Sequence, residues 1–278
     1  MKHIILVLSL CFSIETQAQE LYPSSEPASA MSSKSIGIRV ANEIFPKYDT
    51  PKDEAYTLLN KTIYRLNPEL MWGINKKWMV HVNFYASNAH QSNFKYEGNS
   101  LYVKYRFLSQ DQVQSHFRMA LFAKASLIDN AIQYHEINLA GDNSGLGAGI
   151  IATQLVHKIA VSFTGGYLRN MNNLRNNVPS SFADYGLNYS LSVGYLFLPF
   201  KYTSYNQPNL NLYVEFLGKS NPQTGESFMD IAPAAQLILN SIARIDFVYE
   251  KQLYGNTLRT NNTLFLVRFE YNFLNCYK

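Results

Sequence analysis

The chain has 278 residues, of which 47% are hydrophobic and 14% aromatic, and its formal net charge is +4. The lysines and arginines are spread along the sequence, which does not indicate a nucleic-acid-binding surface. No apolar stretch reaches the roughly 20 residues that a membrane-spanning helix needs. The length would allow one or two soluble domains, but no linker or break in composition divides the chain.

The first residues have the pattern of a secretory signal peptide. Lys2 and His3 precede a short apolar core from Ile4 to Phe12, and Ala18 provides a small residue before a cut near Gln19. We therefore expect a signal peptide at 1–18 and an exported mature chain; the alternative is a buried N-terminal strand. After cleavage Cys276 is the only cysteine left, so no intrachain disulfide can form.

Residues 19–33 form a polar lead rich in serine and proline. Such a segment does not have the pattern of a strand or a helix. We expect it to be a periplasmic N-terminal segment, either poorly ordered or tucked into the mouth of the domain that follows.

From residue 34 onward, short segments alternate apolar and polar side chains. In the last of them Val267 and Phe269 alternate with Arg268 and Glu270. Successive side chains of a strand point to opposite faces, so this period of two predicts strands. The expected strands lie at about 34–43, 62–73, 77–87, 97–107, 114–127, within 136–153, and at about 157–169, 183–197, 209–218, 229–240, 243–252 and 263–273. Pro68 interrupts the second, since proline cannot donate to a sheet ladder.

A strand that is apolar on one face and charged on the other suits a wall between lipid and water. Repeated around a closed circuit, such strands form a barrel with no free edge, which is the strand architecture that can span a bilayer. We therefore predict an all-β fold for residues 34–278: a transmembrane antiparallel up-and-down β-barrel of about 12 strands.

The connections between the expected strands alternate in length. Short turns are expected at 75–76, 109–111, near 157 and at 240–241, and longer polar linkers at 44–61, 87–96, 170–182, 219–228 and 253–262, with 198–208 as an exception. Bacterial barrels have short periplasmic turns and longer outer loops, so the short turns mark the periplasmic end. Aromatic residues at that end, Trp72, Trp78, Phe107, Phe197 and Phe273, are typical of an interfacial girdle.

The polar faces of the expected strands carry as many positive as negative side chains. The positive set is Arg39, Arg65, Lys104, Arg106, Arg118, Lys124, Arg244 and Arg268, and the negative set is Glu43, Glu69, Asp184, Glu215, Asp230, Asp246, Glu250 and Glu270. Charges held away from lipid either line a water pathway or pair with one another. The sequence thus predicts lumen-lining residues without deciding between an open lumen and a braced, closed one.

Two functions follow from this pattern. The first is passive passage of a small, unidentified solute through a mixed-charge lumen, because a barrel of about 12 strands is wider than the eight-stranded barrels that side chains just fill. The alternative is a structural or ligand-binding barrel with a closed lumen, whose outer loops, at 170–182 or 219–228, bind a partner. Neither function is enzymatic.

The chain resembles small monomeric outer-membrane barrel proteins of Gram-negative bacteria. More narrowly, Glu26-Pro27-Ala28-Ser29 and Lys34-Ser35-Ile36-Gly37 resemble the lead and first strand of a family of exported barrels without established activity. The resemblance implies a monomer in the outer membrane, in contact with the lipid bilayer and lipopolysaccharide. Tyr271-Asn272-Phe273 is similar to the terminal aromatic strand that the assembly machinery recognises, although five residues follow it in the sequence.

One short motif suggests lipid-ester hydrolysis as a further alternative. His90-Gln91-Ser92-Asn93 resembles the His-x-Ser-Asn core of outer-membrane phospholipases and of a lipid A deacylase barrel. By position, Ser92 would be the nucleophile and His90 the base, since residues two apart share a strand face. Asn99 is the nearest candidate partner for His90, and Phe94 stands where the phospholipases have glycine.

Two other patterns are weaker. The glycine-rich run 141–149 lacks the lysine of a phosphate-binding loop, and no nucleotide cofactor is expected. Met79, His81, His116 and Met119 are soft-metal ligand types, but the register puts the two histidines on non-adjacent strands and Met119 toward lipid. We expect no metal site and no cofactor.

Overall fold

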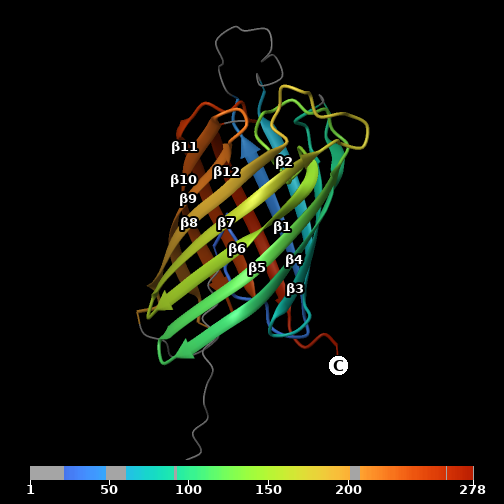
Figure 1. The fold of residues 1–278 in the computed structure, drawn as a ribbon. Coiled ribbons are helices and arrows are strands. Elements are labelled where there is room, and N and C mark those ends of the chain that lie inside the picture. The colour runs from blue at the N-terminus through green and yellow to red at the C-terminus, as the bar shows by residue number, and fades with distance from the viewer. Residues whose placement is uncertain (1–21, 48–60, 91–92, 201–206, 261, 278) are drawn as a thin grey trace, which may run out of the picture.

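A computed structural model describes residues 22–47, 61–90, 93–200, 207–260 and 262–277. They form a closed barrel in which each strand pairs with the next and β1 pairs with β12, so the predicted twelve-stranded antiparallel fold is confirmed (Figure 1). The strands are β1 (Ser35–Phe45), β2 (Ile63–Gly73), β3 (Trp78–Ser87), β4 (Lys95–Gln112), β5 (Ser115–Ile128), β6 (Ser144–Val156), β7 (Ile159–Met171), β8 (Tyr185–Leu198), β9 (Asn209–Asn221), β10 (Glu226–Leu239), β11 (Ala243–Gly255) and β12 (Thr263–Phe273). No helix in the described part of the chain is long and apolar enough to cross a membrane.

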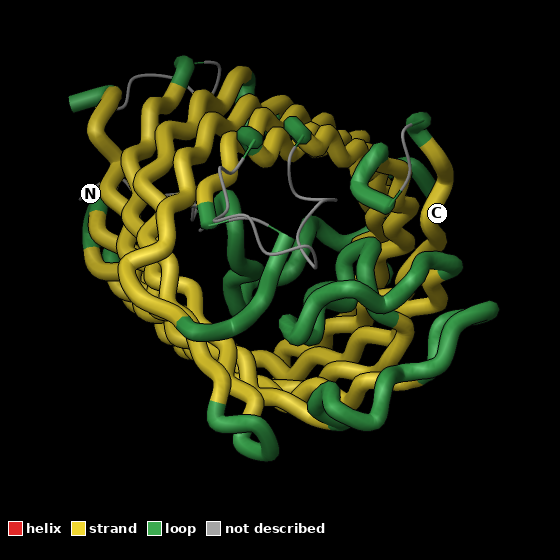
Figure 2. The backbone as a smooth tube through the Cα atoms, turned by 90° about the horizontal axis from the view of Figure 1, so that it is seen from above, coloured by secondary structure: helices red, strands yellow, loops and turns green. Residues whose placement is uncertain are grey.

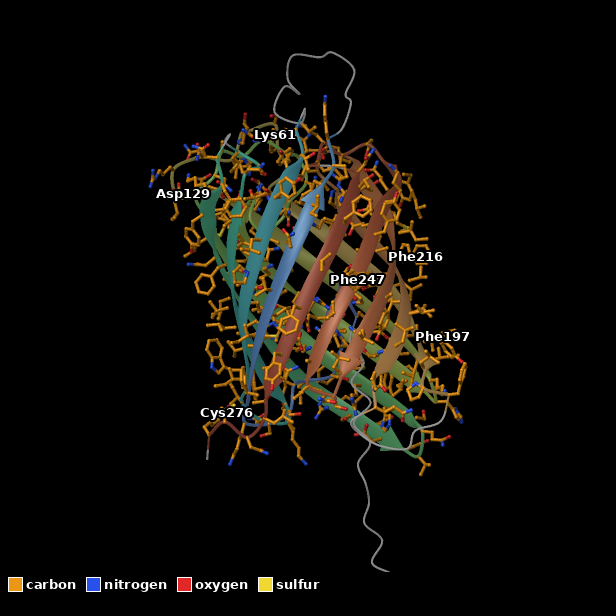
Figure 3. The ribbon with its side chains drawn as sticks, turned by 180° about the vertical axis from the view of Figure 1, so that it is seen from behind. Lys61, Asp129, Phe197, Phe216, Phe247 and Cys276 are labelled. Carbon is orange, nitrogen blue, oxygen red and sulfur yellow. The ribbon has the colours of Figure 1, made fainter. Side chains whose placement is uncertain are left out.

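The outer face of the barrel is apolar because the period-two pattern holds along the strands. On β8, for example, Leu191 and Val193 are exposed, whereas the alternating residues Ser190 and Ser192 are buried. Phe216 and Phe247 lie on the outer wall halfway along the barrel (Figure 3). A closed barrel with an apolar outer face is suited to crossing a bilayer, since its backbone groups pair internally.

The two ends of the barrel differ. At the end where Phe197 and Cys276 lie, the strands are mostly joined by short turns, and we call it the short-turn end (Figure 3). Lys61 and Asp129 lie at the opposite, long-loop end. Trp78, Phe107, Phe197 and Phe273 are exposed near the short-turn end, as the girdle interpretation predicts.

The prolines inside strands are accommodated on the outer face. Pro68 pairs with Val40 of β1, but β3 offers no paired residue opposite it. Pro233 likewise pairs with Val214 of β9 and has no partner on β11. Each proline therefore keeps one neighbouring strand and interrupts the other ladder, which is what the missing N–H requires. Beside Pro233 the lipid-facing wall has an apolar hollow of about 570 Å³.

Two connections differ from the sequence expectation. Residues 129–143 are a long loop, and β6 begins at Ser144, within the range 136–153 in which the sequence placed the sixth strand. The expected loop at 219–228 is a short turn, because β9 and β10 extend to Asn221 and from Glu226, and Gly225 takes φ +73°. β4 runs to Gln112, which moves the turn from 109–111 to Val113 and Gln114.

The N-terminal segment lies inside the barrel. Residues 22–33 precede β1 and run across the interior, where loops are visible within the ring of strands (Figure 2). Tyr22 is 1% exposed and packs edge-on against Tyr213, with a ring separation of 5.6 Å. Of the expected leader, the signal peptide at 1–18 lies outside the described residues.

Candidate functional site: the barrel interior

The N-terminal segment 22–33 is fixed to the wall first through Glu215 of β9. The backbone amides of Ser24 and Ser25 donate to the two carboxylate oxygens of Glu215 at 2.7 and 3.0 Å. Ser25 Oγ donates to the same carboxylate at 2.6 Å and lies 2.7 Å from Ser192 Oγ on β8. Because Ser192 Oγ also donates to Glu215, at 2.9 Å, one carboxylate joins the segment to both β8 and β9.

Glu26 makes the second attachment. It accepts from Arg39 of β1 at 2.8 Å and from Lys104 of β4 at 3.4 Å, and Lys104 also donates to Pro27 O at 2.7 Å. Burial alone would raise the pKa of Glu26, but the charges of Arg39 and Lys104 hold it well below its ordinary value. Glu26 is therefore a carboxylate that joins the segment to two strands.

The end of the segment crosses to the opposite wall. Ala28 N donates to Thr153 Oγ1 of β6 at 2.9 Å, and Ser29 Oγ accepts from Arg118 of β5 at 2.9 Å. Met31 N donates to the sulfur of Met79 at 3.3 Å. Residues 22–33 thus contact walls on both sides of the lumen and obstruct it.

The loop 129–143 obstructs the lumen from the long-loop end. Asp142 forms an ion pair with Arg65 of β2, and Glu136 lies 2.7 Å from Lys219 Nζ of β9 and 3.3 Å from Arg259 Nε of the β11–β12 loop. Its apolar residues Ile137 and Leu139 pack with Leu168 and Ala183.

The acids of this loop are held in their charged form. Burial would raise the pKa of Asp142, but Arg65 and His90 lower it below its ordinary range. In the same way, Lys219 and Arg259 overcome the burial of Glu136 and lower its pKa. The loop is therefore attached by ion pairs to β2, β9 and the β11–β12 loop.

Between the segment 22–33 and the loop 129–143 lies a chamber of about 490 Å³. Both obstructions contribute to its lining, the segment through residues 23–26 and the loop through Glu136, Asn138 and Ala140. Its charged lining residues are Glu26, Arg39, Glu43, Arg65, Glu69, Lys124, Glu136, Lys219, Asp230, Glu250, Arg259 and Arg268. The interior is therefore neither an open pore nor a filled core.

The predicted lumen residues fall into three groups. Arg39, Arg65, Glu69, Lys124, Glu250 and Arg268 line the chamber; Lys104, Glu215, Arg244, Asp246 and Glu270 are buried among other side chains of the interior; Arg106 and Arg118 are half-buried nearer the short-turn end. From the wider set of inward charges, Glu43 and Asp230 also line the chamber. Asp184 does not: it precedes β8, its side chain is 55% exposed, and it lies 3.9 Å from Arg169.

Sequence reasoning missed several charged residues of the interior. Lys219 continues the inward period of β9 two positions beyond Leu217, so a longer strand would have included it. Glu26 and Arg259 lie outside any strand, and no period could place them. Arg259 binds Asp230 at 2.7 Å and lies 3.5 Å from Glu250.

The His90 motif has a different environment from the one expected. His90 Nε2 lies 3.3 Å from Asp142 Oδ1 in the cluster that contains Arg65 and Glu97. Asn99 is exposed and donates to Tyr96 Oη at 3.3 Å, so its suggested role as partner of His90 is wrong. Ser92 lies outside the described residues.

The proposed soft-metal residues and the glycine run have structural surroundings. Nδ1 of His81 lies 2.5 Å from Glu69 Oε1, and Met79 faces the segment 22–33. Over the part of the chain that the structure describes, no three His, Cys, Asp or Glu residues are grouped as a metal site. The glycine run spans the end of the loop 129–143 and the first half of β6, where Gly141 takes φ +107° beside Arg65.

Comparison with protein-family models finds no match, and comparison with curated protein sequences finds none. Among solved structures, an outer-membrane channel of Pseudomonas putida F1 matches with a TM-score of 0.57 and 11% identity, covering 91% of this chain and 100% of that one. The KdgM porin matches with a TM-score of 0.47 and 10% identity, over 85% and 99% of the two chains. OmpF of Salmonella typhi matches with a TM-score of 0.36 and 12% identity, over 86% and 97%.

Only the first of these three likenesses is close enough to carry an argument, and at its low identity the argument concerns the fold. The outer-membrane fold of that match and the apolar outer face of the barrel agree with the predicted location. The chain has the fold of an outer-membrane β-barrel.

Proposed function

We propose that the protein is an outer-membrane channel for a small polar solute, and that the segment 22–33 and the loop 129–143 are two barriers on the solute's path. The observation that carries the proposal is the chamber of about 490 Å³ that lies between them and is lined by charges of both signs. Charged side chains facing the interior of a membrane protein mark solute pathways when they border water-filled space.

The attachment of the segment supports movement rather than permanent closure. Residues 22–33 are joined to the walls by hydrogen bonds and ion pairs, and their apolar contacts are limited to residues such as Tyr22 and Ala28. Polar attachments of this kind exchange with water at small net cost, since each contributes about 0.5–3 kcal/mol. The alternative, a closed ligand-binding barrel, requires both barriers to stay in place.

The location, partners and processing that accompany this function are also proposed. The barrel would be a monomer in contact with the bilayer and lipopolysaccharide, inserted by the assembly machinery after removal of residues 1–18. The chain is similar to exported barrels with a Glu-Pro-Ala-Ser lead. In this structure Glu26 and Ser29 of that motif both bind side chains of the barrel interior.

A reversible crosslink tests the channel proposal. Ser25→Cys and Ser192→Cys, introduced together in a signal-free chain whose Cys276 is replaced by serine, place two thiols where the hydroxyl oxygens are 2.7 Å apart. Conductance in planar bilayers should be low when the disulfide is oxidised and should rise on reduction. The single Ser25→Cys variant is the matched control and should not respond to reductant.

Two results would count against the channel. Equal conductance before and after reduction would mean that ions do not pass where residues 22–33 lie. Absence of conductance in the parent chain and in the reduced variant would favour the closed, ligand-binding barrel.

Lipid-ester hydrolysis stays a second candidate because His90 contacts an acid, Asp142, as a catalytic histidine requires. Signal-free protein in mixed micelles should then release fatty acid from a phospholipid or lipid A, and Ser92→Ala should abolish the release. Activity that survives this substitution, or none in the parent, excludes Ser92 as a nucleophile.

A further inference from the structure

We infer that the chamber binds a zwitterion of the size of an amino acid or short peptide, with its ammonium group at Glu43 and its carboxylate at Lys124. This inference rests on the proposed function and names the class of solute that the channel carries. It comes from the way charges are paired in the lining.

Almost every charge that lines the chamber already has a partner of opposite sign. Arg39 binds Glu69 at 2.9 Å, and Arg268 binds Asp246 at 2.6 Å. The remaining pairs are Arg39 with Glu26, Arg65 with Asp142 and Glu97, Lys219 with Glu136, and Arg259 with Glu136, Asp230 and Glu250. These side chains neutralise one another and do not need a ligand.

Glu43 and Lys124 are the exceptions among the charged lining residues that the structure describes. Glu43 accepts one hydrogen bond, from Asn67 Nδ2 at 2.8 Å; Arg65 is its cross-strand partner on β2, but no described cation lies within ion-pair distance of its carboxylate. Lys124 Nζ lies 5.8 Å from the centre of the Tyr85 ring, and no described carboxylate lies within ion-pair distance of it. The chamber therefore offers one negative and one positive group, each without a salt bridge.

Neighbouring polar atoms are also without partners. Asn67 Oδ1, His81 Nε2 and Tyr102 Oη are buried, have no hydrogen-bond partner, and belong to residues that line the chamber. Asn67 is 9% exposed and His81 is 1% exposed. Buried polar atoms are nearly always satisfied, so these positions are suited to a ligand that both donates and accepts hydrogen bonds.

Charge balance selects a zwitterion over other polar solutes. A simple anion at Lys124 would leave Glu43 without an ion-pair partner, and a simple cation at Glu43 would leave Lys124 without one. A neutral sugar would displace water from both charges and neutralise neither, which is costly. The chamber's volume is within the roughly 300–1,000 Å³ of small-molecule sites, and Tyr85, Tyr102 and Phe122 in its lining provide surface for an apolar side chain.

Calorimetric titration of the refolded, signal-free barrel in detergent tests this assignment. The probes are leucyl-leucine, its N-acetylated form, its C-terminal amide and the neutral sugar maltose. Leucyl-leucine should bind, and removal of either charge from the probe should weaken binding by roughly tenfold or more, because a charge-assisted contact is lost. Maltose should not bind measurably.

Variants connect each end of the ligand to one residue. Glu43→Gln should weaken leucyl-leucine to the affinity of its N-acetylated form, and Lys124→Met should weaken it to that of the amide. Lys76→Met, in the exposed β2–β3 turn, is the matched control and should bind like the parent. Retention of the folded, faster-migrating form in unheated electrophoresis shows that each variant is intact.

The results separate this inference from the channel proposal. Equal binding of leucyl-leucine, its N-acetylated form and its amide would overturn the zwitterion site, and so would equal binding by the parent and both variants. Absence of binding to a barrel that conducts ions would overturn it as well. Selective binding by a barrel that never conducts would instead retain the site and reject the channel.

Discussion

Two groups of charged residues in the same lumen are organised in opposite ways. At the junction of β1 and β12, Glu270 lies 2.7 Å from Arg39 and 2.6 Å from Arg244, and Asp246 lies 2.6 Å from Arg268. We call these five residues the seam cluster. In the chamber, Glu43 and Lys124 have no such partners.

The difference shows that charged side chains serve two purposes in this lumen. In the seam cluster each charge is compensated, so loss of one member leaves another buried and alone, which is the costly case. In the chamber Glu43 and Lys124 are half-buried, border free space and form no ion pair among the described residues. Stability should therefore depend on the seam cluster, whereas ligand selection should depend on Glu43 and Lys124, which we call the chamber pair.

The largest effect is expected from Glu270→Gln, which removes the charge that compensates Arg39 and Arg244. Breaking a buried ion pair from one side costs about 3–5 kcal/mol, and urea unfolding in micelles, followed by tryptophan fluorescence, measures it. Asp184→Asn is the matched control, because its pair with Arg169 is exposed and should contribute at most about 1 kcal/mol. Equal effects of the two substitutions would remove the distinction between the two groups.

An intermediate effect is expected from Asp142→Asn, which leaves Arg65 with Glu97 alone, at 3.3 Å. The free energy needed to open the loop 129–143 should fall by about 1.5–3 kcal/mol, and the loop's amides should therefore exchange hydrogen faster. Asp129→Asn should leave exchange unchanged, because its partner Arg175 is largely exposed. Unchanged protection in Asp142→Asn would mean that apolar packing alone holds the loop.

A smaller effect is expected from Glu26→Gln, which weakens the attachment of the segment 22–33 without removing its hydrogen-bonding oxygen. We expect roughly a tenfold rise in open probability, corresponding to about 1.4 kcal/mol. Because the pKa of Glu26 is below its ordinary value, its contribution is complete above that ordinary value and is lost as the pH falls through the lowered one. Parent channels should therefore open on strong acidification, and Glu26→Gln channels should respond less.

The smallest effect on stability is expected from Glu43→Gln and Lys124→Met. Neither breaks an ion pair, so each should change the free energy of unfolding by at most about 1 kcal/mol in the urea experiment described for Glu270→Gln. A loss as large as that of Glu270→Gln would show that the chamber pair also braces the barrel.

The sequence was sufficient for the wall of the barrel. Its period of two predicted the twelve strands, their outward faces and most of the inward charges, because lipid on one side leaves little freedom for side chains such as Phe247 or Val267. It was least definite at 136–153, where the glycine-rich end of the loop 129–143 runs into β6, and it was wrong at 219–228, where polar residues continue paired strands.

The chamber could not be predicted in the same way. Glu43 and Glu270 look alike in sequence, since both are acids on the polar face of a strand, and only the closed structure shows which forms ion pairs with arginine. Glu26 and Arg259 reach the interior from segments outside the strands. Pairing across the lumen depends on where such segments fold, which a local pattern does not encode.

The seam cluster is complete only when the barrel is closed. Arg39 and Glu270 face each other across β1 and β12, although 231 residues separate them in the chain. Until the final strand arrives, Arg39 would stand near an open sheet edge inside a membrane without one of its three carboxylates. Pairing of β1 with β12 therefore closes the barrel and gives Arg39 its third carboxylate at the same time. A barrel in which these two strands are not paired lacks that stabilisation.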